Sequence, residues 1–87
     1  MEDFPHLTQA MTTVVARLRK QAGLSQQKMA ELSSIARVYL LQLEQGKFRP
    51  TLNSIFYLAR GLGIPPEYLV ELIEKERQQL ENTNRQK

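Results

Sequence analysis

Two polar side chains near the middle of the chain, Arg37 and Gln42, are of the types that read bases in DNA. An arginine can hold O6 and N7 of guanine in a bidentate pair, and a glutamine can pair in the same way with adenine. They lie five positions apart in a segment that we expect to be helical, residues 36–45. Both are on a face of that helix that we do not expect to pack against the core. The alternative is that both are solvated, or that Arg37 contacts a phosphate.

Two apolar side chains, Val38 and Leu41, share this face. Apolar residues on helices usually belong to a core. Here Ile35, Leu40 and Leu43 already mark a buried side, so burying Val38 and Leu41 as well would make the helix apolar almost all round, which a small domain rarely accommodates. We therefore expect this surface to meet DNA, where Leu41 would contact thymine methyl groups, or else a protein partner or water.

Positive charge concentrates around the same helix. Residues 17–60 contain eight basic and two acidic residues, whereas the rest of the 87-residue chain contains four basic and seven acidic ones. A basic surface of this kind is the electrostatic footprint of phosphate binding. Charge alone would fit a solvated surface equally well, so the pattern supports DNA binding without deciding it.

The sequence gives little support for metal binding, catalysis or membrane insertion. The chain has no cysteine, and its single histidine, His6, stands beside Pro5 in what we expect to be a solvated tail, so we predict no metal site and no cofactor. The acids are scattered and no glycine-rich phosphate loop is present, so we do not expect an enzyme. No apolar run approaches the ~20 residues of a membrane helix, and the N-terminus lacks the pattern of a signal peptide. We expect a cytoplasmic protein without a membrane partner.

The supporting elements are all predicted to be helical. Apolar spacing, caps and stop signals predict helices over residues 8–22, 25–33, 36–45, 51–62 and from residue 66 onward. The expected caps are Thr8, Ser25 and Thr51, and three glycines fit helix ends, namely Gly23, Gly46 and Gly63. We expect residues 1–7 to form a tail, 8–74 the domain, and 75–87 a helical extension and tail. The fold class is therefore all-α with five helices.

Two apolar stripes bear on packing. In residues 52–62 the stripe consists of Leu52, Ile55, Phe56, Ala59 and Leu62, which we expect to face the core. The last helix carries a second apolar edge. We predict that it forms a homodimer interface, with closure of the domain's own core as the alternative; its members are Leu69, Leu72, Ile73 and Leu80.

A series of short motifs occurs in a fixed order: Leu18-Arg19, Gly23-Leu24-Ser25-Gln26, Met29-Ala30, Arg37-x-Tyr39-Leu40, Leu43-Glu44-x-Gly46-Lys47, Pro50-Thr51 and Leu58-Ala59-x-x-Leu62-Gly63-Ile64. This set, over residues 12–70, resembles the phage-repressor and Cro-like helix-turn-helix family of the XRE type. The resemblance implies a lambda-repressor-like fold in which residues 36–45 form the recognition helix in the major groove. Base contacts would come from Arg37, Val38, Leu41 and Gln42.

The resemblance also implies supporting roles. The DNA phosphates would be contacted by Gln26, Lys28, Lys47 and Arg49. Arg19 and Glu44 would form an internal pair that fixes the recognition helix. The chain departs from the family pattern at Ala36, which lacks a capping side chain, at Ser34, where glycine is common, and at Leu41, where a polar residue is more usual. Without a cap at Ala36, either a neighbouring serine, Ser33 or Ser34, caps the helix or its first turn is loose.

Together these observations predict a sequence-specific regulator of transcription. It would bind double-stranded DNA as a homodimer on a palindromic operator, because two-fold symmetric proteins place two recognition helices about one DNA turn apart. The alternative is a protein-interaction module of the same fold, such as an antitoxin that holds a toxin, with weak DNA binding or none. The two functions can coexist.

Overall fold

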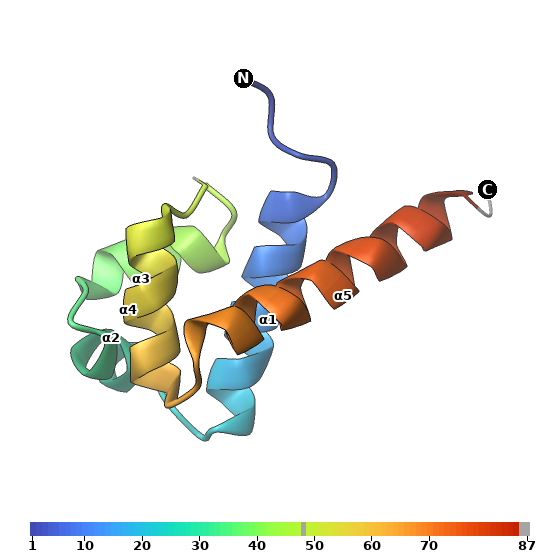
Figure 1. Ribbon diagram of the computed structural model, residues 1–87. Helices are drawn as coiled ribbons and strands as arrows, with labels where there is room; N and C mark the ends of the chain where they lie inside the picture. The colour runs from blue at the N-terminus through green and yellow to red at the C-terminus, as the bar shows by residue number, and fades with distance from the viewer. Residues whose placement is uncertain (48, 86–87) are drawn as a thin grey trace.

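Five helices make up the protein in the computed structural model, which describes residues 1–47 and 49–85. They are α1 (Leu7–Gln21), α2 (Gln26–Ser33), α3 (Arg37–Glu44), α4 (Leu52–Leu62) and α5 (Pro66–Arg85). In Figure 1, α2, α3 and α4 form one group, and α1 and α5 cross beside it. No strand occurs within the described ranges, so the predicted all-α class is confirmed.

The C-terminal part of α5 projects beyond the other helices (Figure 1). The helix is continuous from Pro66 to Arg85, so the predicted boundary between residues 74 and 75 falls inside one element. Residues 86 and 87 of the predicted extension lie outside the described residues.

The core lies where the five helices meet. It is built almost entirely from aliphatic side chains and methionines, which exclude water without leaving polar groups unpaired. The buried apolar residues are Ala10, Met11, Val14, Val15, Met29, Ala30, Leu40, Leu43, Ile55, Leu58, Ala59, Leu69 and Ile73.

Two of the three expected helix caps are confirmed. The Ser25 hydroxyl accepts a hydrogen bond from the backbone N–H of Lys28 at 3.0 Å, and the Thr51 hydroxyl accepts one from the N–H of Ser54 at 3.0 Å. Each satisfies a donor that a helix start leaves without a partner.

The third expected cap, Thr8, is wrong. Helix α1 begins one residue earlier, after His6, which occupies the N-cap position in a left-handed conformation with φ 64°. The backbone N–H and hydroxyl of Thr8 both donate to the Asp3 carboxylate, at 3.2 and 2.9 Å. Asp3 thus performs the capping from outside the helix, and His6 is half-buried instead of lying in a solvated tail.

The apolar stripe of α4 is only partly buried. Ile55 and Ala59 belong to the core, but Leu52 and Phe56 are 70% and 55% exposed. The prediction is wrong for these two residues because the outer face of α4 has no neighbouring helix, whereas Leu58, outside the stripe, is fully buried. An apolar surface therefore remains uncovered on α4.

Helices α2 and α4 approach closely at one point. A Cβ added to Gly61 would overlap the Ser33 hydroxyl and lie 2.9 Å from the Ser33 backbone nitrogen. Only glycine therefore fits at position 61 without a shift of α2. The Ser33 hydroxyl is buried here and has no hydrogen-bond partner.

Candidate nucleic-acid interface

The turn between α2 and α3 sets the direction of α3. Ser34 ends α2 in a left-handed conformation with φ 56°, and the backbone N–H of Ile35 donates to the carbonyl of Ala30 at 3.0 Å. Glycine takes this conformation more readily than serine. Ser34 nevertheless adopts it, and the short connection places α3 at an angle to α2, which is the arrangement of a helix-turn-helix.

Helix α3 begins without a side-chain cap. Ala36 at its N-cap position has no acceptor to offer. Neither serine replaces it, since the Ser33 hydroxyl has no partner and the Ser34 hydroxyl accepts from the Arg60 guanidinium at 3.4 Å. Of the two alternatives, the structure therefore has the one in which no side chain caps the first turn.

One side of α3 is fixed against the domain. Leu40 and Leu43 are fully buried, and the Tyr39 hydroxyl hydrogen-bonds the Ser54 hydroxyl of α4 at 2.6 Å. The Thr12 hydroxyl of α1 donates to the carbonyl of Leu43 at 3.1 Å. These contacts join α3 to both α1 and α4.

The other side of α3 carries the four candidate base-contacting residues. Arg37 is exposed, Val38 is 62% exposed, and Leu41 and Gln42 are half-buried. None of the four belongs to the core cluster. The face therefore offers one guanidinium, one amide and two apolar side chains to a partner, with the most exposed groups in the first turn.

The predicted pair of Arg19 and Glu44 is present and nearly buried. Arg19 donates through Nε and Nη2 to the two carboxylate oxygens of Glu44, at 2.8 and 3.1 Å, and the side chains are 12% and 8% exposed. Arg19 also donates to the carbonyl of Leu24 at 2.9 Å, and the Gln26 amide donates to Glu44 at 3.1 Å. We call these four residues the latch. It joins the C-terminal end of α3 to α1 and to the start of α2.

The candidate phosphate contacts fall into two groups. Lys28 and Lys47 are exposed. Gln26 and Arg49 have partners inside the chain, Gln26 in the latch and Arg49 on the N-terminal segment, where it donates to the carbonyl of Met1 at 3.1 Å and lies 3.9 Å from the Asp3 carboxylate. A phosphate contact by either side chain would compete with these partners.

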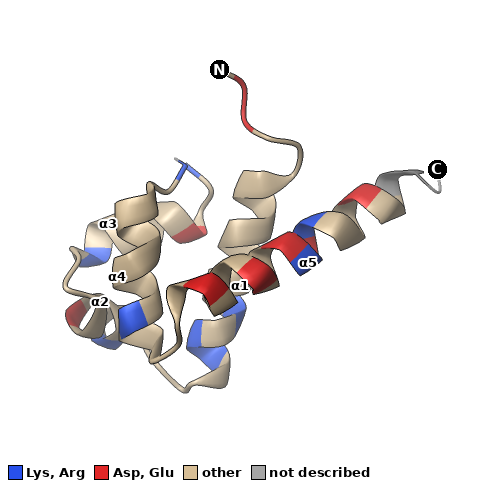
Figure 2. Ribbon diagram, in the orientation of Figure 1, with Lys and Arg blue, Asp and Glu red and all other residues tan. Residues whose placement is uncertain are grey.

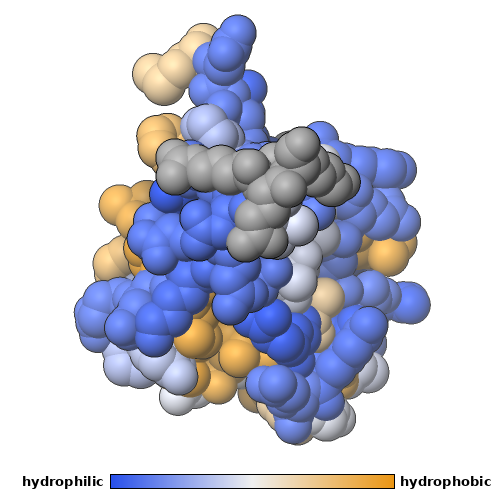
Figure 3. Space-filling model, turned by 90° about the vertical axis from the view of Figure 1, so that its right-hand side faces the viewer, coloured by the Kyte–Doolittle hydropathy of each residue, from blue (hydrophilic) through white to orange (hydrophobic). Residues whose placement is uncertain are grey.

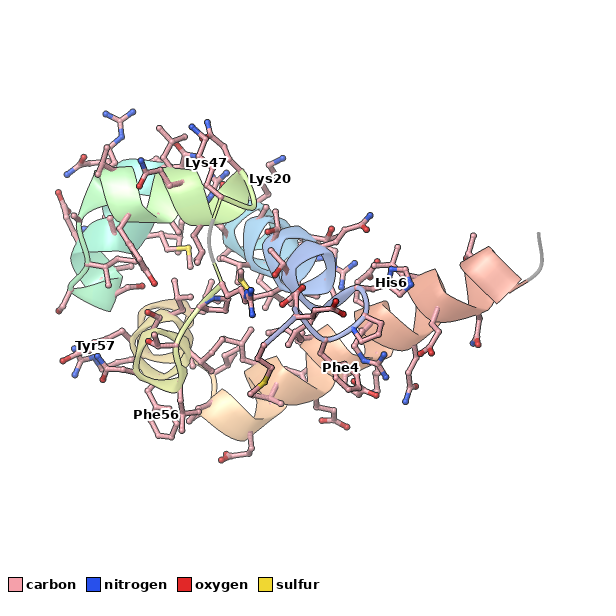
Figure 4. The ribbon with its side chains drawn as sticks, turned by 90° about the horizontal axis from the view of Figure 1, so that it is seen from above. Phe4, His6, Lys20, Lys47, Phe56 and Tyr57 are labelled. Carbon is pink, nitrogen blue, oxygen red and sulfur yellow. The ribbon has the colours of Figure 1, made fainter. Side chains whose placement is uncertain are left out.

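Sequence reasoning missed one exposed cation, Lys20, at the end of α1. Lys20 and Lys47 extend from the side of the molecule that α3 occupies (Figure 4). The signal was present in the basic last turn of α1, Arg19 and Lys20, but only the tertiary structure separates the internal residue from the exposed one.

The basic and acidic residues that are separated along the sequence also concentrate on different parts of the folded chain. Lys and Arg positions predominate on α1, on the loop before α4 and at the exposed parts of α3 and α4, whereas Asp and Glu positions outnumber them on α5, which also carries Lys75 and Arg77 (Figure 2). A polyanion would therefore be drawn to the α3 side and repelled from the α5 side.

The predicted dimer edge on α5 needs a correction. Leu69 is fully buried and Ile73 is 5% exposed, so both close the core of the chain itself, which is the alternative that the sequence left open. Leu72 and Leu80 are partly buried and pack against the same core. The four residues do not form a free apolar edge.

Two further kinds of site were sought in the described part of the chain. It contains no group of three or more His, Cys, Asp or Glu side chains arranged to hold a metal ion. None of its helices is both long enough and apolar enough to cross a membrane.

Comparison with known proteins places the chain in a family. A sequence model for helix-turn-helix domains matches residues 15–69. A helix-turn-helix-type transcriptional regulator of Sinorhizobium fredii is 38% identical over 55 residues, 63% of this chain and 71% of that protein. The immunity repressor protein of Bacillus phage phi105 is 31% identical over 75 residues, 84% of this chain and 52% of the repressor, so the chain spans about half of that relative.

Solved structures agree. The restriction-modification controller protein C.AhdI from Aeromonas hydrophila superposes with a TM-score of 0.68 at 33% identity, over 76% of this chain and 98% of that one. The controller protein C.Esp1396I, solved as a tetramer with its natural 35 base-pair operator, gives a TM-score of 0.79 at 25% identity, over 88% and 99%. The chain therefore belongs to the XRE-type helix-turn-helix family of DNA-binding transcriptional regulators.

Proposed function

We propose that this regulator binds a specific palindromic operator as a homodimer, with α3 of each copy in the major groove. The observation that carries the proposal is the outward face of α3, where exposed Arg37 and Val38 stand in the first turn while Leu40 and Leu43 anchor the opposite side. The C.Esp1396I tetramer on its operator supports the geometry by similarity. A homodimer would place its two recognition helices ~34 Å apart.

Each side chain has a role in this proposal. Arg37 pairs with guanine, Gln42 with adenine, and Val38 and Leu41 contact thymine methyl groups. Phosphates on either side are held by exposed cations and by helix starts, which position the protein without reading sequence. The residues proposed for the phosphates are Gln26, Lys28, Lys47 and Arg49. We assign no catalytic step to the protein and place it in the cytoplasm with the DNA that it regulates.

The experiment selects bound duplexes from a random oligonucleotide pool and then compares variants on the selected site and on random DNA. We expect inverted half-sites whose centres are about 10 base pairs apart. Arg37→Ala should lose about 1–3 kcal/mol on the selected site, relax the preference at one base step, and bind random DNA nearly as before. Equal losses on both DNAs would remove Arg37 from the residues that read bases.

Lys47→Ala should behave differently, since a phosphate contact carries no sequence information. We expect it to weaken binding to both DNAs by a similar factor and to reduce the slope of log K against log salt by ~1. Lys75→Ala, which removes an exposed charge from α5, is the matched control and should change neither quantity. A wild-type protein with little affinity for any DNA and no steep salt dependence would contradict the proposal and favour the protein-interaction module.

A further inference from the structure

The N-terminal segment, residues 1–6, contributes acids to a molecule whose middle part is basic. The segment contains Glu2 and Asp3, whereas residues 17–60 contain eight basic and two acidic residues. In Figure 3 the segment projects at the top of the molecule, where hydrophilic side chains are open to solvent. Acids in this position attract the cations of the middle part and repel the phosphates of any DNA that comes close.

One of those cations, Arg49, is held by the segment. Its guanidinium donates to the carbonyl of Met1 at 3.1 Å and lies 3.9 Å from the Asp3 carboxylate. The side chains of Arg49 and Asp3 are 57% and 33% exposed, so a DNA phosphate can reach the same guanidinium. An arginine that already faces a carboxylate gains less from a phosphate, because the carboxylate must either leave or stay close to a second anion.

Arg49 belongs to the loop that follows the recognition helix. It comes two residues after Lys47, which extends from the α3 side of the molecule together with Lys20, whereas Phe4 lies on the opposite side (Figure 4). The segment that carries Phe4 therefore draws the Arg49 guanidinium away from the side on which the two lysines extend. Lys47 is exposed, so the loop presents one available cation and one that is occupied.

Asp3 is fixed in front of Arg49 by a second task, the capping of α1. Its carboxylate accepts hydrogen bonds from the backbone N–H and the hydroxyl of Thr8, at 3.2 and 2.9 Å. These bonds tie the charge of Asp3 to the first turn of α1. The carboxylate therefore keeps its place beside the loop whether or not Arg49 stays with it.

The segment is also fixed to α5, through Arg77. The Arg77 guanidinium lies 4.9 Å from the centre of the Phe4 ring and donates to the carbonyl of Pro5 at 3.5 Å. It also donates to both oxygens of the Glu74 carboxylate, at 2.7 and 2.9 Å, and to Glu81 at 3.0 Å. The hydrogen bond from Arg77 holds the pKa of the Glu74 carboxyl below its usual value of 4.5, so the cluster stays ionised at neutral pH. The segment is thus held at two places before any DNA arrives.

We infer that the N-terminal segment is an internal competitor of DNA, in which Asp3 and the carbonyl of Met1 occupy Arg49 until a phosphate displaces them. The inference rests on the proposed function, since it adds regulation to one of the proposed phosphate contacts. The competition lowers the affinity for every DNA sequence alike, because a phosphate contact carries no sequence information. Residues 1–6 lie outside the part of the chain that matches the family, residues 15–69.

Asp3→Asn tests the competition, because it removes the charge but keeps a side-chain oxygen for the cap of α1. At low salt this variant binds random duplex DNA about threefold more tightly than the wild type, as measured by fluorescence anisotropy. The gain shrinks as salt is raised, since salt screens exposed charges. Inorganic polyphosphate, which presents phosphates without bases, shows the same gain. Glu71→Gln removes an exposed acid from α5 and is the matched control, with both affinities unchanged.

A double-mutant cycle assigns the gain to Arg49. In an Arg49→Ala background, Asp3→Asn binds both probes no more tightly than Arg49→Ala alone. Phe4→Ala loosens the segment without changing the net charge, and it raises both affinities by up to about twofold. A general effect of net charge would instead persist without Arg49 and would leave Phe4→Ala like the wild type, and this result would overturn the inference.

Unchanged affinity of Asp3→Asn for both probes would also overturn the inference, and so would weaker binding, which would mean that the segment presents Arg49 to phosphates. Circular dichroism establishes that each variant is folded. If Asp3→Asn does not fold, Phe4→Ala, at a side chain that is 59% exposed, decides the question. The proposed function fails separately, when the wild type selects no DNA site, and polyphosphate still tests the competition in that case.

Discussion

The two helices of the motif have the same length, eight residues each, but differ in how their ends are anchored. Helix α2 begins at a side-chain cap, Ser25, and its last residue, Ser33, packs against Gly61 of α4. Helix α3 begins at Ala36 without a side-chain cap, and its last residue, Glu44, is the acceptor of the latch. The supporting helix is therefore fixed at both ends, whereas the recognition helix has an open start and is fixed at its end.

This difference matches the different tasks of the two helices. In α3 the first turn carries Arg37 and Val38, the most exposed of the four base-reading candidates. Its backbone N–H groups point outward from an end that the helix dipole makes positive. An anchored C-terminal end holds the helix axis in place, and an open N-terminal end leaves those groups available to DNA. The predictions below change one anchor at a time.

The largest effect is expected from breaking the anchor of α3. Glu44→Gln leaves the Arg19 guanidinium, which is 12% exposed, without a carboxylate. Removing one member of a nearly buried pair should cost about 3 kcal/mol in the free energy of unfolding. For a domain of this size the melting temperature would fall by roughly 12–24 °C, as measured by circular dichroism. DNA binding should weaken as well, because α3 loses its connection to α1.

A double variant controls for the loss of packing. Arg19→Met with Glu44→Leu replaces both charges with apolar groups of similar size and should recover most of the lost stability. If Glu44→Gln melted within a few degrees of the wild type, the latch would not be the anchor of α3.

The helices and the latch could be predicted for different reasons. Helix positions follow from apolar spacing and from caps such as Ser25 and Thr51, which are local properties of the chain. The pair of Arg19 and Glu44 is separated by 25 residues and was predicted only through the family resemblance. The candidate site was predicted from residue types on α3, and the structure added their exposure.

The failures share a tertiary cause. Periodicity shows that Leu52 and Phe56 lie on an apolar stripe, but it does not show that no helix covers them. The pairing of Arg49 with the N-terminal segment joins residues far apart in the sequence, so no local pattern contains it. In the same way, an apolar stripe on α5 has the same sequence pattern whether a second chain or the chain's own core covers it. Leu69 is fully buried in the core of its own chain.

The next effect concerns the anchor of α2. Gly61→Ala places a methyl group against the Ser33 hydroxyl and 2.9 Å from the Ser33 backbone nitrogen. The helices must separate, and overpacking of this kind costs about 1–3 kcal/mol in the free energy of unfolding. Chemical denaturation measures the loss.

Ser33→Ala is the companion variant. On its own it should be neutral or slightly stabilising, since the Ser33 hydroxyl is buried without a partner. In combination with Gly61→Ala it should recover part of the stability but not all of it, because the contact with the backbone nitrogen remains. Full recovery would show that steric overlap with the Ser33 hydroxyl is the sole reason why alanine does not fit at position 61.

The smallest effect comes from giving α3 the cap that α2 already has. The backbone of Ala36, with φ −69° and ψ 141°, is close to that of Ser25, with φ −70° and ψ 163°, so a serine at position 36 can accept a hydrogen bond from the first turn. Ala36→Ser should raise the free energy of unfolding by about 1 kcal/mol, and Ser25→Ala should lower it by a similar amount. Thermal melts of both variants measure the pair of changes. If Ser25→Ala destabilised the protein while Ala36→Ser had no effect, the first turn of α3 would already be satisfied, and the contrast between a capped supporting helix and an open recognition helix would fail. The affinity of Ala36→Ser for the selected site then tests whether the uncapped first turn of α3 serves DNA binding. If it does, the variant should be more stable than the wild type but should bind the site equally well or more weakly.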